Sequence, residues 1–311
     1  MLEIILIALF VVMAISSEAF IRPGNLLNIL RNVSMTGIIA FGMTFVIIAG
    51  EIDLSVGSTV ALAGVITALT AGKMSDAGIM PMEYAVVLGM AFAILASIGI
   101  GLLNGFLLTK FKMPSFIITL GMLNLLYGVA AVISSGFPVT SLPSWYSVFG
   151  AGSIGGLLPV PAVFLVAVFI IVFIVLKFTR FGRAVYAVGG NPESARLSGI
   201  NVSKTKISVM IIVQVCCAVS GILLSSQVMS GTFSFGKGWE MTAISAVIIG
   251  GASLSGGKGT AAGTFLGLLF LGIINNAMTL NGVDEYVQYI VQGALIIGAV
   301  LINSLQNKKK D

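Results

Sequence analysis

The sequence predicts an all-α, polytopic integral membrane protein with about ten transmembrane helices. Of its 311 residues, 58% are hydrophobic and 38 are glycine, whereas only 9% are charged. Soluble domains carry about 25% charged residues. Ten apolar runs follow one another along the chain, and ten crossings of about 20 residues each account for most of its length. This composition excludes a disordered protein, a disulfide-stabilised scaffold and a protein that takes nucleic acid as its partner.

The ten predicted spans follow directly from the apolar runs. The first run lacks a basic segment before it, so we expect an uncleaved first helix rather than a signal peptide. Because the connections are mostly short, we treat residues 1–311 as one transmembrane domain. The spans are 4–19, 33–50, 56–71, 84–108, 116–133, 160–178, 207–228, 239–251, 260–278 and 286–305.

The third and eighth runs, 56–71 and 239–251, are short for a full crossing. Each borders a glycine-rich stretch. Interrupted spans of this kind often line the solute path in transporters. The alternative is that the true helices extend a few residues beyond these bounds.

The basic residues predict which connections face the cytoplasm. Cytoplasmic loops carry an excess of Lys and Arg. With both termini inside, twelve cations are cytoplasmic: Lys110, Lys112, Lys177, Arg180, Arg183, Arg196, Lys204, Lys206, Lys258, Lys308, Lys309 and Lys310. Only four are then external: Arg22, Arg31, Lys73 and Lys237. The connection 134–159, which contains Trp145 and Tyr146 but no cation, is expected to be an external segment at the membrane interface.

Two stretches of the sequence echo each other. The segments 46–59 (VIIAGEIDLSVGST) and 247–260 (VIIGGASLSGGKGT) share their opening and a Leu-Ser pair, and GLLNG at 101–105 is echoed by GIINN at 272–276. The first copy is longer by about one helix and a turn. Since one extra crossing reverses the chain direction, we expect an inverted internal repeat.

The sequence offers no catalytic, metal-binding or cofactor-binding motif. It has no histidine, and no Cys, Asp and Glu cluster has metal-ligand spacing. The stretch 255–260 (SGGKGT) lacks the spacing of a phosphate-binding loop, so we interpret it as a glycine-rich turn. Adjacent Cys216 and Cys217 lie inside an apolar run and are expected to be packing residues.

A few polar residues within or near the spans are candidates for the translocation pathway. Asp53 is the clearest ionisable residue at membrane depth, which indicates function by default. The alternative is that Asp53 and Ser55 cap the helix that begins at residue 54. Uncharged polar residues could offer weak hydrogen bonds to a hydroxylated solute or could join helices. We take Asp53, Ser55, Asn104, Asn275 and Asn276 as candidates, while Asn124, Gln214, Gln288 and Gln292 are further polar groups of this kind.

The loop 179–206 is the largest predicted cytoplasmic feature. Asn191 followed by Pro192 indicates a helix start, and Ser198-Gly199 indicates its end. A short surface helix flanked by basic residues favours docking to a cytoplasmic protein, although a solvated linker is the alternative. The residues expected to make this contact are Gly190, Asn191, Pro192, Glu193, Ala195, Arg196, Ser198 and Gly199.

These stretches resemble the membrane subunit of ATP-binding-cassette (ABC) monosaccharide importers, the permease type that serves ribose, xylose and galactose. The resemblance covers nearly the whole chain. It is carried by NLLNILRNVSMTGIIAFGMTFVIIAGEIDLSVGS (25–58), KMPSFIITLG (112–121), FGRAVYAVGGNPESARLSGI (181–200), AISAVIIGGASLSGGKGTAAGTFLG (243–267) and NNAMTLNGVDEYVQYIVQGALI (275–296).

The resemblance implies a multi-pass protein of the bacterial inner membrane that forms the translocation pathway but hydrolyses no ATP itself. It implies four partners: a separate ATPase, an external solute-binding protein, a second permease subunit, identical or related, and membrane lipid. The 190–199 segment would be the element that docks in the ATPase.

The chain also departs from the usual pattern of this family. Glu51 stands where glycine is usual, Thr242 where an acid is common, and Gln292 where a lysine is common. The identity of the solute stays open for this reason. A secondary, ion-coupled carrier and a structural membrane protein are the alternatives, and the scarcity of acids within the spans disfavours the carrier.

Overall fold

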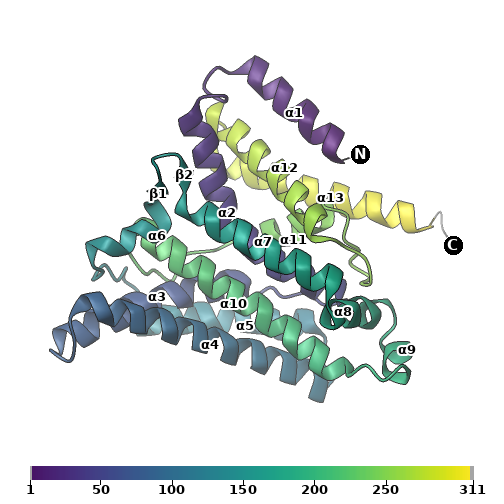
Figure 1. Cartoon of the computed structure of the whole chain (residues 1–311), viewed down its shortest axis with the longest axis horizontal. Helices are drawn as coiled ribbons and strands as arrows, with labels where there is room; N and C mark the ends of the chain where they lie inside the picture. Colours follow the sequence, from purple (N-terminus) through teal and green to yellow (C-terminus); the bar gives the residue numbers. More distant parts are fainter. Residues whose placement is uncertain (1, 309–311) are drawn as a thin grey trace.

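The structure, a computed structural model, describes residues 2–308 and is almost wholly helical over that range (Figure 1). Lys309 and Lys310 of the predicted cytoplasmic tail lie outside the described residues. Between α5 and α7 the chain forms a 3-10 helix, η1 (Ser144–Tyr146), and two short antiparallel strands, β1 (Ser153–Ile154) and β2 (Leu158–Pro159). The α-helices are α1 (Leu2–Ser16), α2 (Pro23–Ile48), α3 (Val56–Asp76), α4 (Met82–Lys110), α5 (Ser115–Ile133), α6 (Ser147–Ala151), α7 (Val160–Phe178), α8 (Arg180–Gly190), α9 (Pro192–Leu197), α10 (Val202–Val228), α11 (Trp239–Ile249), α12 (Ala261–Leu280) and α13 (Glu285–Lys308).

Each of the ten predicted spans coincides with a helix, which confirms the all-α membrane class. By length and composition, seven helices in the described part of the chain can cross a membrane: α2, α3, α4, α5, α7, α10 and α12. The other three spans fall on shorter apolar helices, namely α1, α11 and the Tyr286–Gly298 part of α13.

Two predicted helix bounds were wrong. The helix α2 begins ten residues before the predicted start, because polar residues interrupt the apolar run there but are satisfied inside the protein. The Asn25 amide Nδ2 donates to Asn276 Oδ1 (3.0 Å), and Arg31 donates to the carbonyl of Ala151 (3.2 Å). The helix α3 extends to Asp76 and is not short. Of the two runs predicted to be short, α11 alone remains so: its 11 residues, or about 16 Å, do not cross the roughly 30 Å core of a membrane.

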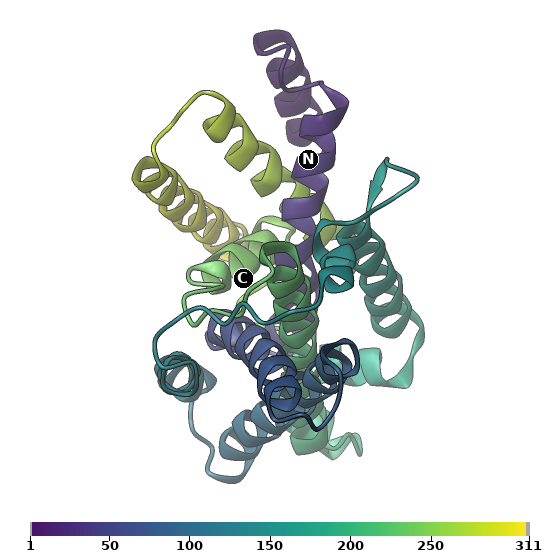
Figure 2. The same cartoon turned by 90° about the vertical axis from the view of Figure 1, so that its left-hand side faces the viewer.

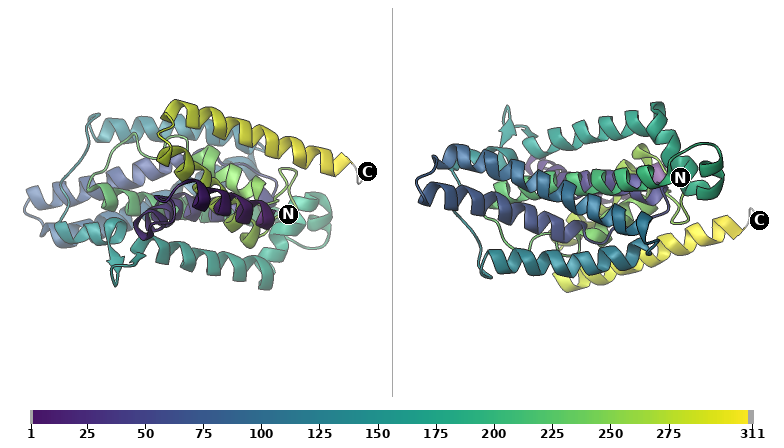
Figure 3. Two further views of the ribbon diagram at one scale, coloured as in Figure 1. Left: turned by 90° about the horizontal axis from the view of Figure 1, so that it is seen from above. Right: turned by 90° about the horizontal axis from the view of Figure 1, so that it is seen from below.

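The helix α2 forms the centre of the molecule. It packs against α7, α10, α11 and α12, and α10 in turn packs against α3 and α4. Figure 2 shows α12–α13 (yellow-green) and α7 (teal) on opposite sides of α2 (purple), and Figure 3 shows α13 and α7 along opposite edges. Most of α2 is buried, whereas α4, α5 and α7 expose most of their apolar side chains. These outer faces suit contact with lipid.

Glycines allow the closest helix contacts. A Cβ on Gly101 or Gly105 of α4 would meet the backbone of α10, and one on Gly263 or Gly267 of α12 would meet the backbone of α11. Small residues let helix backbones approach where there is no hydrophobic drive between helices in lipid.

The molecule has two distinct ends, which we call the α8–α9 end and the hairpin end, the latter carrying β1 and β2. Figure 1 shows that α1 begins and α13 ends toward the α8–α9 end. The ends of α4 and α7 and the start of α10 lie at the same end, so most of the predicted cytoplasmic cations gather there. The basic connections therefore lie at one end of the molecule, as a common cytoplasmic face would require.

The echoing segments lie side by side at the α8–α9 end. There the N–H of Gly257 donates to the carbonyl of Ile48 (2.8 Å), so α2 and α11 run in the same direction. The helix α4 also ends at this end, whereas α12 begins there. The matched pair 101–105 and 272–276 is therefore inverted, and the pair that contains the VII motif is not.

The connection between α5 and α7 contacts the protein more than we expected. Tyr146 is fully buried, and its hydroxyl donates to the carbonyl of Ile222 (2.8 Å) and bonds Ser225 Oγ (2.6 Å). Tyr146 therefore anchors the connection on α10 and does not face a membrane surface. Trp145 beside it remains partly exposed.

Candidate functional site

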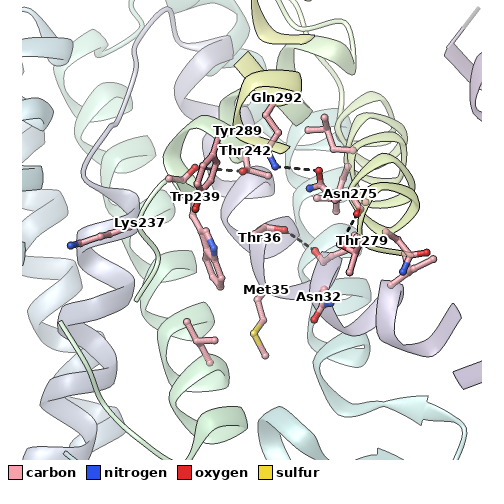
Figure 4. A pocket seen from close by; sticks show the side chains of 18 of the residues that line it. Asn32, Met35, Thr36, Lys237, Trp239, Thr242, Asn275, Thr279, Tyr289 and Gln292 are labelled. Carbon is pink, nitrogen blue, oxygen red and sulfur yellow. Dashed lines mark hydrogen bonds between the residues drawn. The ribbon is translucent and has the colours of Figure 1, made fainter. Parts of the chain in front are cut away.

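A polar cavity of about 400 Å³ lies between α2, α10, α11, α12 and α13 (Figure 4). This volume falls in the range of about 300–1,000 Å³ that is usual for small-molecule sites. The cavity lies toward the hairpin end, because the residues of α2 that line it belong to the first half of that helix. Its polar lining residues are Asn32, Thr36, Gln227, Lys237, Thr242, Asn275, Asn276, Thr279, Tyr289 and Gln292.

The lining suits an uncharged solute with several hydroxyl groups. Amide side chains both donate and accept hydrogen bonds, and hydroxyl side chains do the same. Trp239 and Tyr289 add aromatic faces on which the C–H surface of such a solute can pack. Among the residues that the structure describes, Lys237 is the one charged lining residue and no carboxylate lines the cavity.

Two of the five predicted pathway residues, Asn275 and Asn276, line this cavity from α12. Asn276 is paired with Asn25 of α2 through two amide hydrogen bonds of 2.8 and 3.0 Å. Asn275 Oδ1 accepts from Gln292 Nε2 of α13 (3.2 Å). These amide contacts join α12 to α2 and to α13 around the cavity, so the two residues both line the space and fix its walls.

The other three predicted residues, Asp53, Ser55 and Asn104, form a separate, fully buried cluster. Asp53 Oδ1 accepts from the backbone N–H of Ser55 (2.8 Å) and from its hydroxyl (2.6 Å). Asp53 Oδ2 accepts from Gln214 Nε2 (2.8 Å), and Gln214 Oε1 accepts from Thr59 (2.5 Å). Asn104 Nδ2 lies 3.4 Å from Ser55 Oγ. None of these residues lines the cavity.

This cluster holds a non-helical stretch of chain, 49–55, inside the protein. Gln214 lies twelve residues into α10, so Asp53 is buried about 18 Å along that helix. Backbone groups at membrane depth need partners within the protein. Ser115 Oγ accepts from the N–H of Ile52 (3.2 Å), and Asp53 accepts from that of Ser55. The arrangement favours the interpretation that Asp53 organises the start of α3.

Sequence reasoning missed most of the cavity lining. Thr36, Gln227, Trp239 and Thr279 were not recognised, although each lines the space. A usable signal was present, because polar residues recur at helical spacing: Asn32 with Thr36 on α2, and residues 275 and 279 on α12. A polar stripe of this kind on an apolar helix indicates a face that lines a water-accessible cavity.

The predicted docking helix forms α9 and projects from the α8–α9 end. The Asn191 side chain caps it by accepting from the N–H of Ser194 (2.9 Å). Glu193 and Arg196 form an exposed ion pair of 2.5 Å, and the Arg196 guanidinium lowers the pKa of Glu193. Leu197 beside them is 76% exposed. An exposed apolar side chain next to a charged pair suits contact with another protein.

The helix α8 connects α9 to the end of α2 and to the stretch 250–259 that follows α11. The Tyr186 hydroxyl donates to the carbonyl of Gly259 (2.7 Å). A Cβ on Gly189 would meet the carbonyl of Ile48 and the N–H of Gly257, so only glycine allows this approach. Motion of α9 can therefore pass through α8 to the ends of α2 and α11.

An ion pair also joins the start of α10 to the non-helical stretch after α2. Lys206 Nζ donates to Glu51 Oε1 (2.5 Å), and both side chains are mostly buried. Glu51 is one of the residues that depart from the usual family pattern. Glu51 therefore has an ion-pair partner, Lys206, at the α8–α9 end.

Comparison with known proteins identifies the family. Residues 25–300 match the family described as "Branched-chain amino acid transport system / permease component". The ribose import permease protein RbsC of Bacillus subtilis (strain 168) is 41% identical over 300 residues, which cover 96% of this chain and 90% of that protein. RbsC of Escherichia coli (strain K12) is 40% identical, covering 98% and 93%. The L-arabinose ABC transporter permease protein AraH of Azospirillum brasilense is 33% identical, covering 98% and 87%.

No solved structure matches the chain. The family match extends over most of the described helices, from α2 into α13. The relatives are also similar over nearly the full length of both proteins. The chain therefore belongs to this family of membrane permease components of transport systems.

Proposed function

We propose that the chain is the permease subunit of an ATP-driven importer for a monosaccharide or a similar polyhydroxylated solute. The observation that carries the proposal is the full-length similarity to permeases named for ribose and L-arabinose. The cavity supports it, since amides, hydroxyls and aromatic rings are the groups that bind an uncharged sugar. ATP is hydrolysed by a separate subunit, and this chain supplies the pathway.

The α8–α9 end faces the cytoplasm of a bacterial cell, and both termini lie on that side of the inner membrane. The gathering of Lys and Arg at this end supports the orientation. The hairpin end then faces outward, where the cavity can receive solute from an external binding protein. A second permease subunit completes the membrane part of the importer, and lipid covers the remaining apolar faces.

Coupling proceeds from the ATPase through α9 and α8 to the end of α2 and to the stretch 250–259 that follows α11. The exposed pair Glu193–Arg196 and the exposed Leu197 form the docking surface. Movement of α8 then displaces the ends of α2 and α11, because Gly189 packs against Ile48 and Gly257. This displacement opens the α8–α9 end below the cavity, so the solute leaves toward the cytoplasm.

Reconstitution into liposomes tests the proposal. The permease, its ATPase and its binding protein are assembled, and the accumulation of labelled D-ribose and L-arabinose is followed with and without ATP. We expect uphill accumulation of a sugar only when ATP and the binding protein are both present. Controls omit the ATPase or replace ATP with a non-hydrolysable analogue.

A secondary carrier gives the opposite pattern. Uphill accumulation by the permease alone, driven by an ion gradient without nucleotide, contradicts the proposal and favours ion-coupled transport. No accumulation of any sugar, despite stimulated ATP hydrolysis, contradicts the proposed solute class.

A further inference from the structure

Two buried oxygen atoms beside the cavity have no hydrogen-bond partner. They are the hydroxyl Oη of Tyr127 on α5 and the carboxylate Oε2 of Glu240 on α11, and neither is bonded to any group in the described part of the chain. A buried polar atom without a partner costs free energy, and a carboxylate oxygen costs more than a neutral group. Such a pair requires an explanation.

Both atoms face the same point at the start of α3. A Cβ on Gly57 would lie 3.0 Å from Tyr127 Oη and 2.6 Å from Glu240 Oε2. Glycine at this position keeps the surroundings of the two oxygens free of a side chain. A single hydroxyl group beside them satisfies both atoms, because it donates to the Glu240 carboxylate and accepts from the Tyr127 hydroxyl.

The pair adjoins the solute cavity. Lys237 lines the cavity, and its ammonium lies 5.7 Å from the centre of the Tyr127 ring. Trp239, which immediately precedes Glu240, also lines the cavity. The first three residues of the short segment 237–240 therefore line the cavity, and the fourth, Glu240, carries one of the two unpaired oxygens. The pair therefore adjoins the part of the cavity wall that this segment forms.

We propose that Tyr127 and Glu240 form a hydroxyl-binding subsite that selects polyhydroxylated solutes on their way through the cavity. The inference rests on the proposed function and adds specificity residues to it. A site whose buried polar groups need a solute hydroxyl strongly rejects the analogue that lacks it. Tyr127 and Glu240 therefore recognise one hydroxyl of the sugar, whereas the amides of the main cavity bind its other groups.

Uptake by the reconstituted complex tests the subsite. Labelled D-ribose and its 2-deoxy, 3-deoxy and 5-deoxy analogues are offered to the parent and to Tyr127→Phe and Glu240→Gln. Dividing the kcat/KM of each variant by that of the parent for the same sugar cancels the selectivity of the binding protein. Tyr84→Phe and Glu83→Gln, both exposed at the start of α4, are the matched controls.

We expect both variants to lower the kcat/KM for D-ribose at least tenfold, and to lower that for one deoxy analogue less than threefold, because that analogue lacks the recognised hydroxyl. A change within twofold for D-ribose in both variants overturns the subsite. Equal losses for all four sugars also overturn it, because they indicate a structural role or a bound water only.

The outcome stays decisive if one variant is unstable or if the function differs. Tyr127→Phe removes a single oxygen atom and decides the question where Glu240→Gln does not assemble. If the parent takes up sugar and the variants take it up equally well, the subsite is overturned and the proposed function is not. No uptake of any sugar by the parent overturns the proposed function and the subsite with it.

Discussion

The carboxylate of Asp53 accepts three hydrogen bonds from Ser55 and Gln214 in a fully buried environment. At the scale of the single residue, this arrangement explains why an acid is tolerated at membrane depth. Its oxygens take up donors that would otherwise have no partner where the chain leaves its helical path. The cost of burying the acid is offset by the hydrogen bonds that it receives.

Replacing Asp53 therefore tests a structural role against a transport role. Asp53→Ala leaves the Ser55 N–H without its acceptor, at a cost of about 1–3 kcal/mol, and leaves Gln214 Nε2 with Ser55 Oγ (2.9 Å) as its remaining acceptor. We expect the detergent-purified variant to lose its monodisperse gel-filtration peak at a temperature roughly 5 °C lower. Asp76→Ala, at the exposed end of α3, serves as the control. Unchanged stability with abolished uptake instead places Asp53 on the solute path.

At the scale of the element, α8 is the part of the chain that contacts α9, the end of α2 and the stretch 250–259 that follows α11. Its end approaches them so closely that a side chain does not fit at Gly189, whereas a Cβ on Gly99 of α4 would meet nothing within 4 Å. Both glycines lie within helices but have opposite surroundings. They offer a matched pair for testing the contact.

Gly189→Ala is expected to force α8 away from Ile48 and Gly257, and so to weaken coupling. ATP hydrolysis by the reconstituted complex then continues while sugar uptake falls at least tenfold. Gly99→Ala is expected to keep both activities within twofold of the parent. Equal behaviour of the two variants would show that the close contact of α8 does not transmit the motion.

The helix α9 allows a second test at this scale. Replacing Glu193 and Arg196 together with alanine removes the exposed ion pair without disturbing a buried group. We expect the double variant to insert in the membrane normally but to hydrolyse ATP without driving uptake. Parallel measurements of membrane insertion, ATP hydrolysis and uptake check this, and normal uptake contradicts a docking role.

At the scale of the whole molecule, the sequence predicted the helices well and the site poorly. The ten spans were predictable because apolar composition over about 20 residues is a local property of the chain. The start of α2 was missed because Asn25 finds its partner, Asn276, about 250 residues later. The grouping of Asp53 with Gln214 was missed for the same reason, because pairing between residues far apart in the sequence leaves little trace in local composition.

The helix α9 was predicted within its actual bounds because its signals are local. Asn191 caps α9, Pro192 begins it, and Gly199 follows its end with a positive φ of 83°. The cavity required the packing of five helices, so its lining residues did not stand out in the sequence. Of the five predicted pathway residues, Asn275 and Asn276 lie at the cavity.

We propose that a separate ATPase on the cytoplasmic side drives a passive pathway in this chain. Sugar accumulation in proteoliposomes, measured with the complete complex and with the permease alone under an imposed proton or sodium gradient, tests it most directly. The account predicts ATP-dependent uphill accumulation by the complex and none by the permease alone. Uphill accumulation by the permease alone in the absence of nucleotide would contradict it.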